Sequence, residues 1–349
     1  MKASFALEIS IEQRLGQTVE PCPICRGSSA LWHRASDHHY GNSGTWNVYR
    51  CTACGHMFQH PVPTEEELCR FYPDSYYAHQ VPDTDLTHRG LRHRGVWLTL
   101  HYLKYFRGYR HLPVYKNPIL ACVGSFLDPR PLWFAAPHFS PGGYLLDYGS
   151  GSGATVVFMQ YVGWQAEGIE LNPHAAQAGK DAGLAVYHGS IETLEHLAER
   201  YAYIMSSHCV EHVPDVWRLF RAFFKALKPG GVLAVDIPNA NALAIDRYGE
   251  LYYYLTMPVH VHLFTPISIA HLAKSVGFND ISIKTYSRWK SQAKSEALLS
   301  RLRRKQSVDQ GFNSVRRGEE LLGILRSLPT YVSSRMQGRG DCLVLTCRK

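Results

Sequence analysis

Short apolar runs alternate with helical periodicity through the second half of the chain. An apolar run at 144–148 precedes a helical pattern over 153–163, and a second apolar run follows at 165–170. The alternation then continues, with further strands predicted at 184–188, 202–207, 231–237, 280–287 and 342–347, and further helices at 173–182, 192–200, 214–227 and 266–275. Strands that alternate with helices predict an α/β fold built on a doubly wound, seven-stranded sheet.

The first 90 residues are less regular. Apolar residues recur at helical spacing over 1–20, which predicts a short lead-in helix. Thr64 and Glu67 have the spacing of a capping box, so a second helix is expected over 65–72. Residues 78–90 are polar and have the composition of a linker.

Two helical stretches flank or interrupt the α/β pattern. The first covers 91–112 and is rich in aromatic and basic residues, and six prolines break up residues 113–141 after it. We interpret 78–141 as a helical linker or cap on the α/β part. An alternative is a peripheral membrane contact through 91–127. The second stretch, at 289–330, is a basic helical insertion before the final strand.

Composition places few limits on function. The chain has 349 residues, 45% of them apolar, which is enough for two domains with a sizeable core. Its formal charge of +8 favours anionic partners, but we interpret the densest basic runs, 89–110 and 301–317, as solvated helix faces. No secretion signal is visible at 1–19, and no apolar run approaches the roughly 18–20 residues of a membrane span. We therefore expect a cytoplasmic protein with reduced cysteines.

Four of the nine cysteines form two Cys-x-x-Cys pairs. Cys22 and Cys25 make the first pair, and Cys51 and Cys54 make the second, with Gly55 directly after it. Two such pairs predict a zinc ribbon with four thiolate ligands, and the glycine permits the tight turn that such a knuckle needs. A redox role is the alternative, and the presence of a second pair argues against it.

A glycine-spaced turn follows the strand at 144–148. The order is Asp147-x-Gly149-x-Gly151-x-Gly153, and Glu170 ends the next strand about twenty residues later. A phosphate-binding P-loop is excluded because no Lys-Ser/Thr follows the glycines. An acid just before the first glycine would repel a phosphate but would attract a cation. Glu170 can accept both hydroxyl groups of a ribose, so S-adenosylmethionine fits these residues.

Three further stretches resemble the class I S-adenosylmethionine-dependent methyltransferases in order and spacing. They are 202–213, 227–233 with Leu-Lys-Pro-Gly-Gly, and 262–278 with His-Leu-Phe-Thr-Pro followed by Gly-Phe. The resemblance spans about residues 142–287 and implies a Rossmann-like sheet with the cofactor beyond the carboxyl ends of its strands. The cofactor-binding residues expected there are Asp147, Gly149, Ser150, Gly151, Gly153, Glu170, Leu171, Ser190, Ile191, Glu192 and Ser207.

Ser190 departs from the family pattern, because many relatives have an acid there against the adenine amino group. We expect Ser190 to bond the adenine and Ile191 to pack on its ring. Residues 51–77 resemble the lead-in of bacterial methyltransferases that act on sugars, surface glycans or secondary metabolites. The predicted domains are a zinc ribbon at 1–77, the linker or cap at 78–141, and a methyltransferase domain at 142–349 that contains the insertion at 289–330.

His208, Glu211 and His212 directly follow the strand predicted at 202–207. One hypothesis makes His208 or His212 the general base that takes a hydroxyl proton from the acceptor. A second lets His208, Glu211 and His212 bind a divalent ion, as in the ubiquinone-pathway O-methyltransferases, whose pattern has a carboxylate at the position of His208. A third assigns Glu211, His212 and Val213 to the start of a helix that packs against the cofactor site.

His260, His262 and Tyr253 are candidates for lining the acceptor pocket, with core packing and helix capping as the alternative interpretation. The remaining cysteines, such as Cys209 and Cys342, are expected to be buried thiols. Together these residues predict methyl transfer to oxygen, or to carbon, of a small or glycan-related acceptor in a biosynthetic pathway. Two other functions stay open, a ribosomal-RNA methyltransferase and a binding protein without catalysis, although nucleic acid is not the expected partner.

Overall fold

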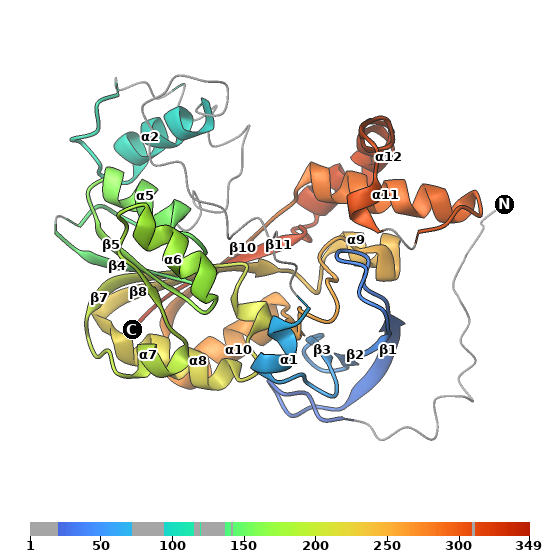
Figure 1. Cartoon of the computed structure of the whole chain (residues 1–349), viewed down its shortest axis with the longest axis horizontal. Helices are drawn as coiled ribbons and strands as arrows, with labels where there is room; N and C mark the ends of the chain where they lie inside the picture. Colours follow the sequence, from blue (N-terminus) through green and yellow to red (C-terminus); the bar gives the residue numbers. More distant parts are fainter. Residues whose placement is uncertain (1–19, 72–93, 115–118, 120–136, 141, 309–310) are drawn as a thin grey trace.

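The computed structural model describes residues 20–71, 94–114, 119, 137–140, 142–308 and 311–349 (Figure 1). The lead-in helix predicted over 1–20 falls outside these residues, apart from residue 20 itself. The polar linker predicted at 78–90 also lies outside the described residues, as do residues 120–127 of the possible membrane contact at 91–127.

A seven-stranded sheet forms the larger part of the protein and confirms the predicted fold class. In spatial order its strands are β10 (Asn279–Tyr286), β11 (Cys342–Arg348), β8 (Leu227–Pro238), β7 (Tyr201–Ser207), β4 (Tyr144–Tyr148), β5 (Gln165–Glu170) and β6 (Val186–His188). The pairs that join β8, β7, β4, β5 and β6 are parallel, whereas β11 is antiparallel to both of its neighbours. The strand order reverses at β4, which is where open α/β sheets bind their ligands.

Successive residues of the central strands point to opposite faces of this sheet and build two separate cores. Leu145 and Tyr203 belong to one apolar cluster, while Leu146 and Ile204 belong to the other. Figure 1 shows α5 (Ala154–Tyr161) and α6 (Pro173–Asp181) over the first face. The second face is covered by α8 (Val216–Ala226) and α10 (Pro266–Val276), with α7 (Ile191–Glu195) beside α8.

The helices and strands predicted for the α/β part lie close to the observed ones, and its helix α7 differs most. The pattern predicted a helix over 192–200, whereas α7 ends at Glu195. Glu199 adopts a left-handed conformation with φ 48°, which a continuing helix does not allow. The capping box at α1 (Glu65–Cys69) is present, because the Thr64 hydroxyl accepts from the Glu67 amide at 3.2 Å.

A second, four-stranded sheet carries the cysteine pairs. Its strands are β1 (Ser29–Ala35), β2 (Trp46–Cys51), β3 (Met57–Gln59) and β9 (His262–Leu263), all antiparallel. The strand β9 comes from the part of the chain that the sequence assigned to the methyltransferase domain. Residues on both sides of the predicted boundary therefore form one sheet.

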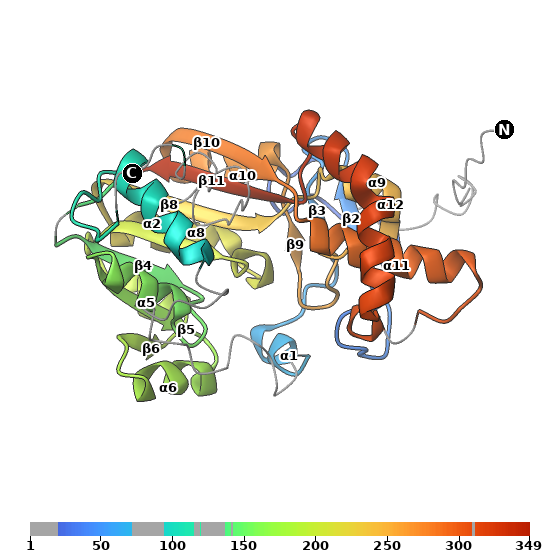
Figure 2. The ribbon, with the colours of Figure 1, turned by 90° about the horizontal axis from the view of Figure 1, so that it is seen from above.

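The remaining helices lie outside the two sheets (Figure 1). They are α2 (Arg94–Phe106), α9 (Leu243–Tyr248), α11 (Trp289–Arg303) and α12 (Arg317–Met336), with single 3₁₀ turns at η4 (Val210–His212), η5 (Gly249–Leu251) and η6 (Phe312–Ser314). The predicted insertion at 289–330 is a pair of packed helices, α11 and α12, that continues to Met336 (Figure 2). Among the described helices, none combines the length and the apolar character that crossing a membrane requires.

Candidate functional site

The turn after β4 is built from glycines that no other residue can replace without strain. Gly149, Gly151 and Gly153 have φ angles of 77°, 55° and 95°, in the left-handed region. A Cβ on Gly149 would lie 2.5 Å from the sulfur of Cys209, and one on Gly153 would lie 2.8 Å from Val186. The left-handed backbone and these close contacts therefore both require glycine at Gly149 and Gly153.

Asp147 near the end of β4 and Glu170 at the end of β5 lie beside this turn. The Glu170 carboxylate accepts hydrogen bonds from the Gly151 amide at 2.7 Å and from the Asn172 amide at 2.8 Å. Asp147 is 4% exposed, and burial together with the charge of Glu170 raises its pKa to about 7, although a hydrogen bond with Thr155 opposes the rise. Two acids beside a glycine turn favour a ligand that has positive charge and hydroxyl groups.

The other predicted cofactor residues lie at the ends of β5, β6 and β7. Leu171 is 44% exposed directly after Glu170. Ser190 caps α7, and its hydroxyl donates to the Glu192 carboxylate, which also pairs with Arg218 at 2.7 Å. Ile191 is 3% exposed and packs in the apolar core. The side chain of Ser150 lies against the backbone of β5, because a Cβ on Gly168 would lie 2.4 Å from the Ser150 oxygen.

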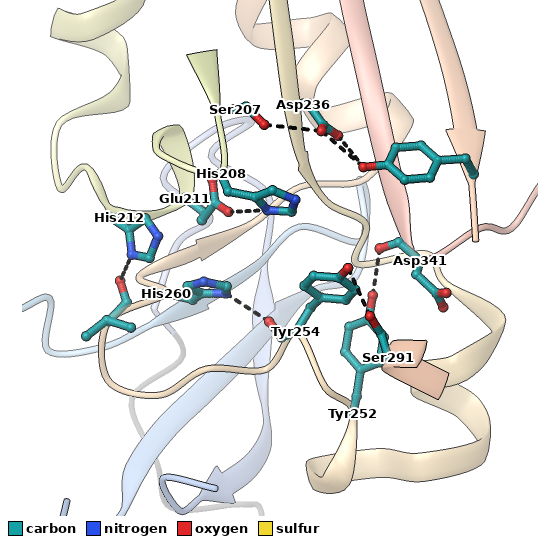
Figure 3. Close-up of polar contacts among 12 residues, drawn as sticks. Ser207, His208, Glu211, His212, Asp236, Tyr252, Tyr254, His260, Ser291 and Asp341 are labelled. Carbon is teal, nitrogen blue, oxygen red and sulfur yellow. Dashed lines mark hydrogen bonds and ion pairs between the residues drawn. The ribbon is translucent and has the colours of Figure 1, made fainter. Parts of the chain in front are cut away.

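His208 and Glu211 form an ion pair beyond the carboxyl end of β7 (Figure 3). The His208 Nδ1 lies 3.2 Å from one carboxylate oxygen of Glu211, whose side chain is fully buried. Burial lowers the pKa of His208. Hydrogen bonds to Cys342 and Glu211 and the charge of Asp236 outweigh burial, so the pKa of His208 lies well above its usual value. Burial raises the pKa of Glu211, but His208, His212 and His260 outweigh it and the net shift is downward. His208 therefore carries a proton at neutral pH, and Glu211 does not.

His212 is a neutral imidazole beside this pair. Burial lowers its pKa, although Glu211 opposes the shift. Its Nδ1 lies 2.9 Å from the carbonyl oxygen of Val259, which requires the proton on Nδ1 and leaves the lone pair on Nε2. The rings of His212 and His260 lie 4.6 Å apart, and the Nδ1 of His260 bonds the carbonyl oxygen of Tyr254 at 2.9 Å (Figure 3).

The structure places the three residues that were predicted to line the acceptor pocket at different distances from the site. His260 lies with Glu211 and His212. His262 lies instead at the cysteine-bearing sheet, where its Nδ1 is 3.1 Å from the Nε2 of His56. The ring of Tyr253 packs on His39 and Phe312, and it also lies 5.2 Å from the ring of Tyr254, which stacks on His208.

Asp236 near the end of β8 was missed by the sequence analysis. Its carboxylate accepts from the Ser207 hydroxyl at 3.4 Å and from the Tyr286 hydroxyl at 3.0 Å (Figure 3). Burial raises its pKa to about 6, while the charge of His208 and the bond from Tyr286 oppose the rise. A single acid within the apolar run 232–237 was the signal that could have identified it.

Two groups of side chains in the described part of the chain can hold a metal ion. One consists of Cys22, Cys25, Cys51 and Cys54, whose sulfur atoms all lie within 4.8 Å of one another. The other consists of Glu211, His212 and His260, again within 4.8 Å. The second carboxylate oxygen of Glu211 is buried and has no hydrogen-bond partner among the residues that the structure describes.

Comparisons with known proteins agree with this fold. A family model described as a methyltransferase domain matches residues 127–283. A ubiquinone biosynthesis O-methyltransferase from Xanthomonas axonopodis pv. citri is 27% identical over 185 residues, which cover 48% of this chain and 77% of that protein. An uncharacterized methyltransferase from Mycobacterium sp. strain JLS is 34% identical over 108 residues, or 30% of this chain and 43% of that one.

Among solved structures, a SAM-dependent methyltransferase from Archaeoglobus fulgidus is similar to this chain, with a TM-score of 0.45 and 18% identity. The match covers 62% of this chain and 91% of that chain.

Proposed function

Because this chain is an S-adenosylmethionine-dependent methyltransferase, we propose that it methylates an oxygen of a small-molecule acceptor and that His212 is its general base. The observation that carries this proposal is the position of the His212 imidazole, which has a ring nitrogen within 4.8 Å of the buried carboxylate of Glu211. Burial lowers the pKa of His212, which favours the neutral form that a base needs. The Xanthomonas relative is an O-methyltransferase, which supports methylation of oxygen over methylation of carbon. A glycan-related acceptor and carbon methylation stay predictions.

The residues at the glycine turn fit the cofactor. When bound, S-adenosylmethionine supplies an electrophilic methyl carbon on a sulfonium sulfur. We propose that Gly149 and Gly151 let the backbone approach it, that Glu170 accepts its ribose hydroxyls, and that Asp147 lies near its cationic part. Ser190, Ile191, Glu192, Leu171 and Ser207 stay predicted contacts of the adenosyl group.

His212 and Glu211 account for the proton in this proposal. The Nε2 of His212 takes the acceptor's hydroxyl proton as the oxygen–methyl bond forms and the carbon–sulfur bond breaks. Glu211 stabilises the imidazolium that results, since a buried carboxylate strongly favours a neighbouring positive charge. His212 then returns the proton to water. His208 is already protonated and paired with Glu211, so we assign it a role in positioning Glu211.

The test is His212→Ala with methyl transfer followed by the mass of the acceptor, across a panel of phenols and sugar alcohols. We expect turnover to fall by about 10²–10⁴ while the affinity for S-adenosylmethionine is kept. His196→Ala, at an exposed histidine that ends α7, is the matched control and should keep full turnover. Unchanged turnover in His212→Ala would remove the base assignment.

A second candidate is a divalent metal ion held by Glu211, His212 and His260. One carboxylate and two imidazoles suit a transition metal, and the unpaired, buried oxygen of Glu211 fits a ligand role. A bound ion would lower the pKa of an acceptor hydroxyl. This set differs from the predicted one, because His260 takes the place of His208.

His260→Ala distinguishes the two candidates. If His212 acts as a base, His260→Ala keeps most of the turnover, whereas loss of a metal ligand removes turnover in both variants. Activity that depends on added Mn²⁺ or Zn²⁺ in the wild type, and no longer in His260→Ala, would favour the metal.

We also propose that the four cysteines hold a structural zinc ion. Their sulfur atoms converge, with Cys22 to Cys54 at 3.7 Å and Cys25 to Cys51 at 3.5 Å. The Cys54 amide points to the sulfur of Cys51 at 3.5 Å, as amides do around a thiolate ligand. A zinc content of one ion per chain would support this assignment, and a metal-free, fully folded chain would contradict it.

A further inference from the structure

The helix α12 exposes a continuous apolar stripe. Large apolar residues recur along it at intervals of three or four, which places them on one side of the helix. They are Leu321, Leu325, Leu328, Val332 and Met336, which are 57, 69, 52, 45 and 83% exposed, with Leu322 at 49% beside them. A folded protein rarely leaves so many large apolar side chains together in water without a binding role.

The buried side of α12 consists of small residues. Gly323, Ser327, Thr330 and Ser334 face inward. A Cβ on Gly323 would lie 2.2 Å from the backbone oxygen of Ala293, so α12 and α11 approach each other closely at this glycine. The helix thus turns its small residues toward the protein and its large apolar ones outward, the reverse of an ordinary surface helix. Figure 2 shows α12 lying along the outside of the molecule.

The positive charge of the chain gathers around the same helix pair once acids are counted with bases. Residues 288–339 contain twelve Lys and Arg against four Asp and Glu, a net charge of +8. The whole chain also has a net charge of +8, so basic and acidic residues are equal in number in the rest of the chain. Several of these bases are exposed: Arg303, Arg304, Lys305, Arg326 and Arg335.

We propose that α11 and α12 dock the protein on an anionic phospholipid surface. Leucines on one helix face with bases around them are typical of helices that lie in a membrane interface. The apolar stripe would enter the boundary of the acyl chains while the bases contact lipid phosphates. A second copy of the chain suits this face less well, because it would bring a charge of +8 against another charge of +8.

A second element supports the same orientation. In Figure 1, α2 lies at the upper left above the larger sheet and α12 lies at the upper right above the smaller sheet, and Figure 2 shows both toward the viewer. Tyr105 and Phe106 of α2 are 48% and 42% exposed. Aromatic side chains favour the headgroup region of a bilayer, so α2 adds to the proposed docking face.

The test is co-sedimentation of the full chain with vesicles. We expect binding to phosphatidylcholine vesicles that contain phosphatidylglycerol, little binding to phosphatidylcholine alone, and weakening by salt. Leu325→Glu/Leu328→Glu should reduce the affinity by at least about tenfold, since each buried leucine contributes on that scale. The matched control is Ile267→Glu, at an apolar residue of α10 that is 65% exposed, and it should bind as the wild type does.

Circular dichroism and S-adenosylmethionine binding show whether the double variant is folded, and sedimentation equilibrium tests self-association. Equal vesicle binding by wild type and double variant would overturn the proposal. A wild-type dimer that dissociates in the double variant, together with no binding to vesicles, would also overturn the proposal. A second copy of the chain would then cover the stripe. Binding to RNA but to no vesicle would overturn the proposal as well.

Discussion

Asp147 is the residue whose environment says most about the cofactor. It lies ahead of the glycine turn, it is almost fully buried, and its pKa is raised to about 7 mainly by burial. An acid with so high a pKa is partly protonated at neutral pH, and a cationic group near it would favour the charged form. Cofactor binding at this residue should therefore be linked to the release of a proton.

The affinity for S-adenosylmethionine should accordingly rise as the pH rises through about 7, because the protonated carboxyl must lose its proton to face a cation. Calorimetry in two buffers with different ionisation enthalpies measures the released proton. Asp147→Asn should bind more weakly and without the pH dependence. An affinity that does not change with pH in the wild type would contradict the proposed contact.

Gly149→Ala tests the turn itself. The left-handed backbone costs alanine about 1 kcal/mol, and the new Cβ would lie 2.5 Å from the Cys209 sulfur, which adds to that cost. Gly183→Ala is the matched control, because Gly183 has the same φ of 77° and open space around its Cβ. We expect a larger fall in melting temperature and cofactor affinity for Gly149→Ala. Equal effects would show that the contact with Cys209 is easily relieved.

At the scale of elements, the short strand β9 joins the cysteine-bearing sheet to the methyltransferase part. It pairs with β3, and directly after it the Thr265 hydroxyl donates to the carbonyl oxygen of Cys54 at 2.6 Å. The Trp217 ring nitrogen of α8 donates to the carbonyl oxygen of Pro23 at 2.9 Å. The four cysteines are therefore built into the catalytic part, and disorder among them should spread to α8 and α10.

Removal of the proposed zinc ion should destabilise the whole chain. We expect Cys25→Ser, or treatment with a strong chelator, to lower the free energy of unfolding by more than about 3 kcal/mol in one cooperative transition. Thermal unfolding with metal analysis measures both quantities. Cys347→Ser, at a buried cysteine of β11 outside the cluster, should keep its metal. A separate early transition would indicate that the cysteine-bearing sheet unfolds alone.

At the scale of the molecule, two buried histidines lie where the cysteine-bearing sheet packs on the larger part of the chain. His262 of β9 and His56, directly before β3, lie 3.1 Å apart, and His262 also contacts the carbonyl oxygen of Pro214. Both histidines have lowered pKa values because burial disfavours their charged forms. A histidine with a depressed folded pKa is neutral in the native state and becomes charged in the unfolded chain. Its contribution to stability is therefore present above the unfolded value of about 6.5 and is lost as the pH falls toward the folded value.

For His262 the folded pKa is about 4, so acidification to about pH 5 should remove about 2 kcal/mol of stability through this residue. His262→Gln cannot titrate, and the difference in its free energy of unfolding between about pH 7.5 and about pH 5 should be smaller by that amount. Urea unfolding at the two pH values provides the measurement. An equal pH dependence in both proteins would show that His262 is not the titrating group.

Local patterns in the sequence were enough to predict the strands and flanking helices of the seven-stranded sheet, the glycine turn, Glu170 and the four cysteines. Period-two and helical spacings, left-handed glycines and paired cysteines each act through residues close together in the chain, so the sequence alone carries them. The positions of His208 and His212 after a strand made both of them candidates for the base, without a choice between them.

Only the tertiary structure decided which distant residues meet. It grouped His260, and not His262, with Glu211 and His212. It showed that Glu211 pairs with His208, that β9 pairs with β3, and that α12 turns its leucines outward. The physical reason is that burial and charge, and hence each pKa and each exposed face, depend on neighbours far away in the sequence, which no local pattern specifies.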